Sequence, residues 1–147
     1  MKRLLCLLAF GWLLGLSTTA LAADAHVALV KRVEGSVKVV RASGSVEASG
    51  GTQLLVSDRL IAAPGATASI VFRDGTLLTL GSGADVLVRD YLFEPKDDAF
   101  SFSLYLNKGS AIYESGKIGK LKPEAVKIDT PTATVGVRGT RLLIEAN

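Results

Sequence analysis

Apolar and polar residues alternate with a period of two along most of the chain from Val27 onward. The alternation is clearest in residues 36–40, 67–73 and 100–107, where every second side chain is aliphatic or aromatic. A strand with one buried face produces this pattern, because successive side chains point to opposite sides of a sheet. After the first 22 residues, apolar side chains nowhere keep helical spacing for three turns. The pattern therefore predicts many short strands and little helix.

Short groups of turn-forming residues separate these strands. They are Glu34-Gly35, Ser43-Gly44, Gly50-Gly51, Pro64-Gly65, Asp74-Gly75, Gly81-Ser82-Gly83, Lys108-Gly109 and Ser115-Gly116. Many short strands joined by turns indicate an all-β domain. Extended residues flank Asp74 and Gly75, and we expect a hairpin with a type I′ turn there, because Asp and Gly tolerate the positive φ angles of that turn.

Two stretches interrupt the alternation, and each contains one proline. Residues 90–98 are rich in acidic side chains, and residues 116–124 contain three lysines. The acidic groups Glu94, Asp97 and Asp98 lack the spacing of a calcium-binding loop, and the lysines lack the interleaved aromatic residues of an anion-binding platform. We therefore interpret both stretches as exposed, solvated loops.

The first 22 residues have the three parts of a secretory signal peptide. Lys2 and Arg3 form the basic start, residues 4–16 form an apolar run, and residues 20–22 read Ala-Leu-Ala. Signal peptidase requires small residues at the first and third of these positions. The apolar run is shorter than the roughly 20 residues that span a bilayer. We predict a cleaved signal peptide and no membrane span in the mature chain.

Cleavage is predicted after Ala22, which leaves a mature domain of residues 23–147. The only cysteine, Cys6, lies in the predicted signal peptide. A secreted domain without disulfides depends on its core and its hydrogen bonds, which fits a bacterial periplasm, or secretion from the cell. Removal of Lys2 and Arg3 leaves 15 basic and 14 acidic residues, a net charge of +1. So small a charge predicts no binding of nucleic acid.

Residues for catalysis are scarce. The only histidine, His26, lies four residues after the predicted cleavage site, where a chain end is commonly frayed. Without a thiol and with one terminal imidazole, the mature chain lacks the groups of a catalytic triad or a zinc site. Its aspartates stand beside turns, where they commonly bond the backbone. We predict no enzyme activity, no catalytic residue, no metal and no other cofactor.

Residues 130–140 read TPTATVGVRGT, a β-prone stretch in which Gly136 and Gly139 flank Val137 and Arg138. Glycine in a strand indicates a bulge or the close approach of another strand. The stretch resembles the closing motif of FecR-domain proteins, which belong to the bacterial envelope. The residues that carry this resemblance are Thr130, Pro131, Ala133, Val137, Arg138, Gly139 and Thr140.

Further stretches resemble other parts of a FecR domain. Residues 33–39 resemble its opening, residues 54–62 an early strand, and residues 68–76 its central hairpin with Asp74 and Gly75. Ser57 stands where the family usually has glycine. The resemblance covers about residues 33–145 and implies a periplasmic β-fold, either a short antiparallel-rich β-solenoid or a β-roll or sandwich. The pattern of strands does not choose between these arrangements.

The resemblance implies a protein-binding module of the envelope, active in periplasmic signalling or assembly. Its partner would be another envelope or periplasmic protein. A carbohydrate- or peptidoglycan-binding module is the alternative, and it requires exposed aromatic side chains beside polar groups. The candidates are Tyr91, Phe93, Tyr105 and Tyr113.

Arg138 is the only charged residue of the closing motif. Its five donors suit strand carbonyls or a nearby carboxylate, so we expect a role in the fold; the alternative is contact with a carboxylate of a partner. In residues 141–146, Leu142 and Ile144 share one face and Leu143 lies on the other. We predict a strand whose open edge docks a partner; the alternative is that residues 37–40 pair with it.

Overall fold

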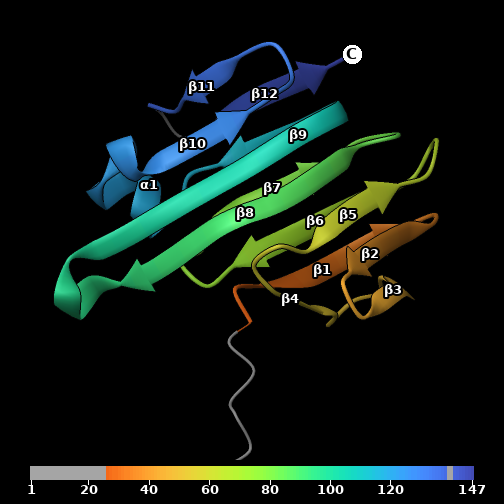
Figure 1. Ribbon diagram of the computed structural model, residues 1–147, viewed down its shortest axis with the longest axis horizontal. Coiled ribbons are helices and arrows are strands. Elements are labelled where there is room, and N and C mark those ends of the chain that lie inside the picture. The colour runs from red at the N-terminus through yellow and green to blue at the C-terminus, as the bar shows by residue number, and fades with distance from the viewer. Residues whose placement is uncertain (1–25, 139–140) are drawn as a thin grey trace, which may run out of the picture.

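The predicted strands are present and form one curled, half-barrel sheet (Figure 1). The computed structural model describes residues 26–138 and 141–147. Most neighbouring strands are antiparallel, and the all-β fold class is confirmed. The curled arrangement is nearer to the roll than to the solenoid. The predicted signal peptide lies outside the described residues.

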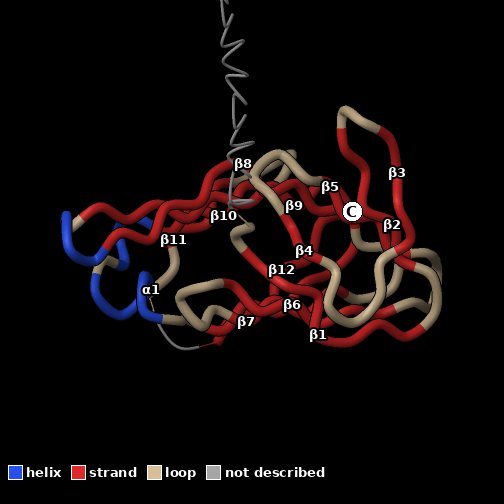
Figure 2. The backbone as a smooth tube through the Cα atoms, turned by 90° about the horizontal axis from the view of Figure 1, so that it is seen from below, coloured by secondary structure: helices blue, strands red, loops and turns tan. Residues whose placement is uncertain are grey.

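The sheet consists of two halves that face each other (Figure 2). The β8 half contains, in spatial order, β3 (Gly44–Glu47), β2 (Val37–Arg41), β5 (Arg59–Ala62), β8 (Asp85–Glu94), the first part of β9 (Ala99–Glu114), β10 (Val126–Asp129) and β11 (Thr134–Gly136). The β7 half contains β12 (Arg141–Ala146), the second part of β9, β7 (Leu77–Leu80), β6 (Thr67–Phe72), β1 (Ala28–Glu34) and β4 (Gln53–Leu54).

β9 passes from one half of the sheet into the other (Figure 1). β8 pairs with residues 99–108 of β9, and β7 pairs with residues 111–114 on the same side. On the opposite side β10 pairs in parallel with residues 102–105, and β12 pairs in antiparallel orientation with residues 109–114. A single strand of 16 residues therefore holds four neighbours.

The core lies between the two halves and is built from the inward positions of the alternating strands. Val37, Val39 and Leu60 from the β8 half, and Ile70, Leu78 and Leu80 from the β7 half, are fully or almost fully buried. The rings of Phe72 and Phe102 meet edge to face across the core, with centroids 4.9 Å apart. The predicted alternation is confirmed in β2, β6 and β9, where the inward apolar positions are the most deeply buried ones.

The prediction of a loop at residues 90–98 is wrong for the first half of this acidic stretch. β8 continues to Glu94, and the 3-10 turn η1 (Pro95–Asp97) connects it to β9. Tyr91 and Phe93 continue the alternation and lie opposite Phe102 and Phe100 on β9. Pairing with the long neighbour β9 thus extends the strand through charged residues.

The lysine-rich stretch is also more ordered than a loop. It contains a short helix, α1 (Lys117–Leu121), and a 3-10 turn, η2 (Pro123–Ala125). Ile118 is fully buried and anchors α1 to the domain. Among the described residues, no helix is long and apolar enough to cross a membrane.

The predicted hairpin at Asp74 and Gly75 joins β6 to β7, but its turn is not type I′. A type I′ turn requires positive φ at both central residues. Here Gly75 has φ +87° and Asp74 is not among the residues with positive φ. The amide of Gly75 donates to the carbonyl of Phe72, and the amide of Phe72 donates to the carbonyl of Thr76. These two bonds define a hairpin loop of residues 73–75, which ends in a glycine with positive φ.

Candidate docking edge and family motifs

β12 lies at one edge of the β7 half, at the upper border of Figure 1. Within the described part of the chain it pairs with β9 alone. The alternative pairing with residues 37–40 is wrong, because those residues belong to β2, between β3 and β5. The backbone groups on the outer side of β12 therefore have no strand partner among the described residues.

The side chains of β12 divide as the alternation predicts. Ile144 is buried and Leu142 is half-buried against the core. Leu143, on the other face, is 60% exposed. Arg141 and Glu145 share this exposed face, and Arg141 Nη1 lies 3.5 Å from Glu114 Oε1 on β9. The edge thus combines an unpaired backbone with an aliphatic side chain between two opposite charges.

The described part of the closing motif forms the hairpin between β10 and β11. Thr130 closes it, since its hydroxyl accepts from the Ala133 amide at 3.1 Å and its own amide donates to the Ala133 carbonyl at 2.8 Å. Pro131 and Ala133 are exposed, and Val137 is buried. Gly139 and Thr140, the last two residues of the motif, lie outside the described residues.

Arg138 is exposed and lines a groove of about 440 Å³ beside β11. Val126 and Val137 supply apolar surface in this groove, and Lys127 and Glu124 supply charge. The Arg138 guanidinium makes no hydrogen bond or ion pair with any residue in the described ranges. The role in the fold that the sequence predicts for Arg138 needs a hydrogen-bond acceptor, and that part of the chain supplies none.

The central motif forms a buried junction around Asp74. Its carboxyl group is almost fully buried and accepts hydrogen bonds from three residues: Thr76 through its amide and its hydroxyl, Tyr91 through its phenol at 3.0 Å, and Ile118 through its amide at 3.1 Å. The carboxyl group joins the β6–β7 turn to β8 and to α1. Burial is the main reason that the pKa of Tyr91 is raised well above its usual value, so the phenol keeps its proton.

A close backbone contact completes this junction. A Cβ atom at Gly116 would lie 2.3 Å from the Thr76 amide nitrogen. Only glycine lets the segment before α1 approach the hairpin so closely. The turn residues of the sequence predict the hairpin, but its partners lie 17 to 44 residues further along the chain and have no signal in the local pattern.

A second buried carboxyl group, that of Asp58, organises the turn before β5. It accepts a hydrogen bond from the Leu55 amide at 2.8 Å. Arg41 Nε donates to its two oxygens, at 2.9 Å to Oδ1 and at 3.0 Å to Oδ2. Ser57, in this turn, has φ +75°. That angle lies in the left-handed region, which favours glycine. The geometry explains why glycine suits this position better than serine.

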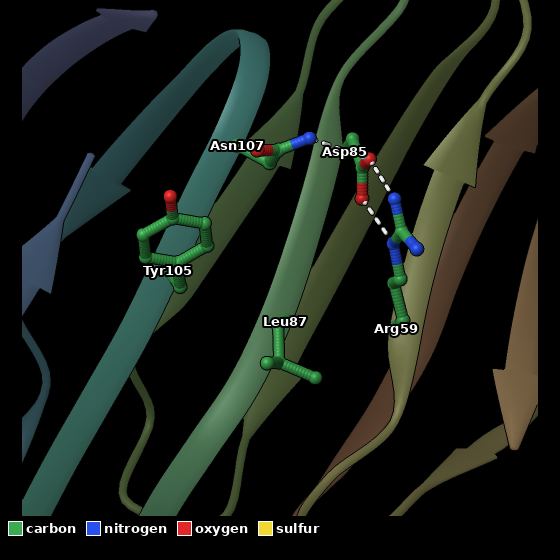
Figure 3. Close-up of a pocket in the computed structure, with 5 residues that line it drawn as sticks. All are labelled: Arg59, Asp85, Leu87, Tyr105 and Asn107. Carbon is green, nitrogen blue, oxygen red and sulfur yellow. Dashed lines mark hydrogen bonds and ion pairs between the residues drawn. The ribbon is translucent and has the colours of Figure 1, made fainter. Parts of the chain in front are cut away.

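A shallow pocket of about 270 Å³ lies on the outer face of the β8 half (Figure 3). Arg59 Nε donates to Asp85 Oδ1 at 2.7 Å, a second guanidinium nitrogen donates to Asp85 Oδ2, and the Asn107 amide donates to the same oxygen at 3.2 Å. The hydrogen bonds from Arg59 are the main reason that the pKa of Asp85 is lowered below its usual value. Leu87 and Tyr105 complete the lining.

The four aromatic residues proposed for glycan contact have different surroundings. Tyr91 and Tyr113 are buried, and Phe93 is half-buried against Phe100, with ring centroids 6.0 Å apart. Tyr105 lines the pocket, and the Arg89 guanidinium lies 4.2 Å from its ring centroid. Tyr105 is thus the one of the four that stands beside polar groups at the surface.

The described residues hold no group of three or more His, Cys, Asp or Glu side chains placed to bind a metal ion. His26 is half-buried at the start of the described chain, next to β1. The carboxyl groups of Asp58, Asp74 and Asp85 are occupied by hydrogen bonds from their neighbours.

These features define an all-β domain with a buried hairpin junction and an open sheet edge. The family model described as FecR protein matches residues 58–147, more than half of the chain, and the chain belongs to the FecR family. The match includes the Asp74 junction, the closing motif and β12, and it begins after the opening stretch at residues 33–39. No curated protein and no solved structure matches the chain. FecR is a regulatory and signalling family whose domains are generally periplasmic.

Proposed function

We propose that this FecR domain is a non-enzymatic interaction module of the bacterial envelope, which binds a protein through the open edge of β12. The observation that carries the proposal is the combination at this edge: an outer backbone without a described strand partner and Leu143 at 60% exposure. A partner strand would satisfy the free amides and carbonyls by extending the β7 half.

The other edge strands are weaker candidates because they are shorter. β12 has six residues, whereas β3 has four, β11 three and β4 two. A longer edge offers more backbone hydrogen bonds to an added strand. Only part of the binding energy would come from the backbone, and exposed Leu143 would supply an apolar contact.

Photo-crosslinking in the envelope tests this proposal. A photoreactive residue at position 143 should give a defined crosslinked product. The matched control is position 46 on the edge strand β3, where Val46 has similar exposure, 47%. Equal products at both positions, or no product at 143, would contradict docking at β12.

A proline substitution sharpens the same test. Leu143→Pro removes an amide from an edge strand, which a sheet tolerates better than at a central strand. With the photoreactive residue moved to position 147, directly after β12, we expect a folded Leu143→Pro domain that no longer forms the crosslinked product, and Leu143→Lys is the variant that keeps the amide. Association that survives both substitutions would place the docking surface elsewhere.

Location in the periplasm is part of the proposal. The Ala-x-Ala pattern at residues 20–22 and the preceding apolar run support export with cleavage after Ala22. The exported protein should begin at Ala23, which mass spectrometry of the periplasmic fraction measures. A full-length chain in the inner membrane would contradict the proposed cleavage.

A glycan-binding role is the second candidate, and Tyr105 is the observation that favours it. Its ring lines the outer pocket together with Asn107 and Asp85, and Arg59 lies on the far side of the pocket (Figure 3). Sugars stack on aromatic faces and bond adjacent polar groups. If the pocket binds peptidoglycan, Tyr105→Ala should abolish sedimentation of the protein with isolated sacculi, and Leu143→Lys should leave it unchanged.

A further inference from the structure

We infer that the strand that docks on β12 is β12 of a second copy of this chain. This inference rests on the proposed docking edge and names its partner. The sequence of the edge, Arg141-Leu142-Leu143-Ile144-Glu145, is self-complementary when read in opposite directions. A twofold axis through Leu143 would join two copies into one continuous antiparallel sheet.

Charge fixes the register of this pairing. With the axis at Leu143, Arg141 of one copy lies opposite Glu145 of the other, and the same pair recurs at the opposite end. Opposite charges on facing strands attract, whereas like charges in that position repel. A shift of the axis to Leu142 or Ile144 places a charged residue opposite Leu143 and removes both ion pairs.

The faces of the strands match in the same register. Leu143 lies opposite its own copy on the exposed face, between the two ion pairs. On the other face Leu142 of one copy lies opposite Ile144 of the second copy, and both residues already pack toward the core of their own domain. The pairing thus covers the exposed Leu143 side chain and extends two existing cores side by side.

The backbone permits this register. In an antiparallel strand the amide and carbonyl of one residue point to the same edge, and those of the next residue point to the other edge. When the twofold axis passes through a residue, the amides and carbonyls that point out of one β12 face those that point out of the other, so a hydrogen-bonded ladder can form. An axis between two residues would place residues with outward amides and carbonyls opposite residues whose amides and carbonyls point inward. The register chosen by charge is therefore one that the backbone accepts.

Neither charged residue is required inside its own domain. Arg141 has a side chain that is 67% exposed, and its ion pair with Glu114 has a separation of 3.5 Å. Glu145 is exposed and makes no ion pair with another described residue. In the pair of copies, Arg141 would lie between Glu114 of its own chain and Glu145 of the second copy.

Charge reversal and mixing test the inference by light scattering of the purified protein. The molar mass measured for the wild-type protein should be twice the mass of a single chain. Arg141→Glu and Glu145→Arg should each raise the dissociation constant of the dimer about tenfold or more, because each creates two repulsive pairs. An equimolar mixture of the two variants should form dimers again, since every facing pair then has opposite charges.

The mixing step also excludes unfolding as the cause of dissociation, because unfolded variants would not reassociate. Lys38→Glu, on the outer face of β2 away from this edge, is the matched charge control and should keep the wild-type mass. A monomeric wild-type protein, or two variants that dimerise as well as the wild type, overturns the inference. So does a mixture that stays monomeric.

Crosslinking at position 143 separates this inference from the proposed function. A product of twice the chain mass that contains only this protein supports both. If the wild-type chain is a monomer and the product contains a different envelope protein, the inference of a second copy is overturned, and β12 remains a docking edge. Absence of any product at position 143 contradicts both.

Discussion

The two motifs that carry the resemblance to FecR domains occupy opposite environments. In the central motif, Asp74 is 2% exposed and its carboxyl group is surrounded by donors from three other residues. In the closing motif, Pro131, Ala133 and Arg138 are exposed, and Arg138 has no polar partner in the described chain. The first motif holds the domain together, and the second presents side chains to the solvent.

The largest expected effect comes from breaking the buried junction. Asp74→Ala leaves the Thr76, Tyr91 and Ile118 donors without their acceptor inside the domain. Buried donors left unpaired cost about 1 to 3 kcal/mol each, so we expect a loss of about 3 kcal/mol or more in the free energy of unfolding. Urea denaturation followed by circular dichroism measures this loss. A change below about 1 kcal/mol would contradict the structural role of the junction.

A smaller and pH-dependent effect is expected at the Arg59–Asp85 pair. Asp85→Asn should lower the free energy of unfolding by about 1 kcal/mol at pH 7, since the arginine side chain is 46% exposed and water weakens the pair. The folded state lowers the pKa of Asp85, so its stabilising contribution is present above the unfolded pKa and is lost as pH falls through the folded pKa.

The difference between the wild type and Asp85→Asn should therefore shrink below about pH 4. Asp90→Asn is the matched control, because Asp90 accepts a hydrogen bond from the Ser101 hydroxyl at the surface and forms an ion pair with no arginine of the described ranges. If the two variants lose the same stability at every pH, the ion pair makes no special contribution.

Replacing Ser57 should strengthen the other buried carboxyl turn. Ser57→Gly removes the strain of a positive φ angle, partly offset by the greater freedom of glycine in the unfolded chain. We expect a gain of about 0.5 kcal/mol in the free energy of unfolding. Ser43→Gly, in an exposed turn where serine does not have positive φ, should give no gain. Destabilisation by Ser57→Gly would show that the serine side chain itself is needed.

The smallest effect on stability is expected in the closing motif. Arg138→Ala should change the free energy of unfolding by less than about 0.5 kcal/mol, because the side chain is exposed and without a described partner. The melting temperature checks this. A loss comparable to that of Asp74→Ala would restore the fold role first expected from the sequence and would remove the contrast between the two motifs.

The local pattern of the sequence predicted which side chains of a strand are buried, but it did not predict which strands pair with one another. The alternation correctly identified the buried positions of β2, β6 and β9, because strand periodicity depends on neighbouring residues alone. It also identified Leu143 as facing away from Leu142 and Ile144. It did not identify β9 as the partner of β12, since nothing in the period of a strand specifies its neighbour.

The misinterpreted stretches have the same explanation. Residues 90–94 are strand despite their charges, because β9 continues beside them and supplies backbone partners. Ile118 and the amides around it fold against Asp74, which is 44 residues away in the sequence. The aromatic candidates likewise differ in exposure, and only tertiary packing distinguishes buried Tyr113 from Tyr105 in the outer pocket.

The length of β9 has a consequence for how this domain folds and opens. Neither half of the sheet is complete without β9, so the halves should form in one cooperative step and not as separate units. Most of its neighbours are distant in sequence, which predicts slow folding. Amide hydrogens in the middle of β9 should exchange with solvent only when the whole domain unfolds, whereas those on the outer edge of β12 should exchange early.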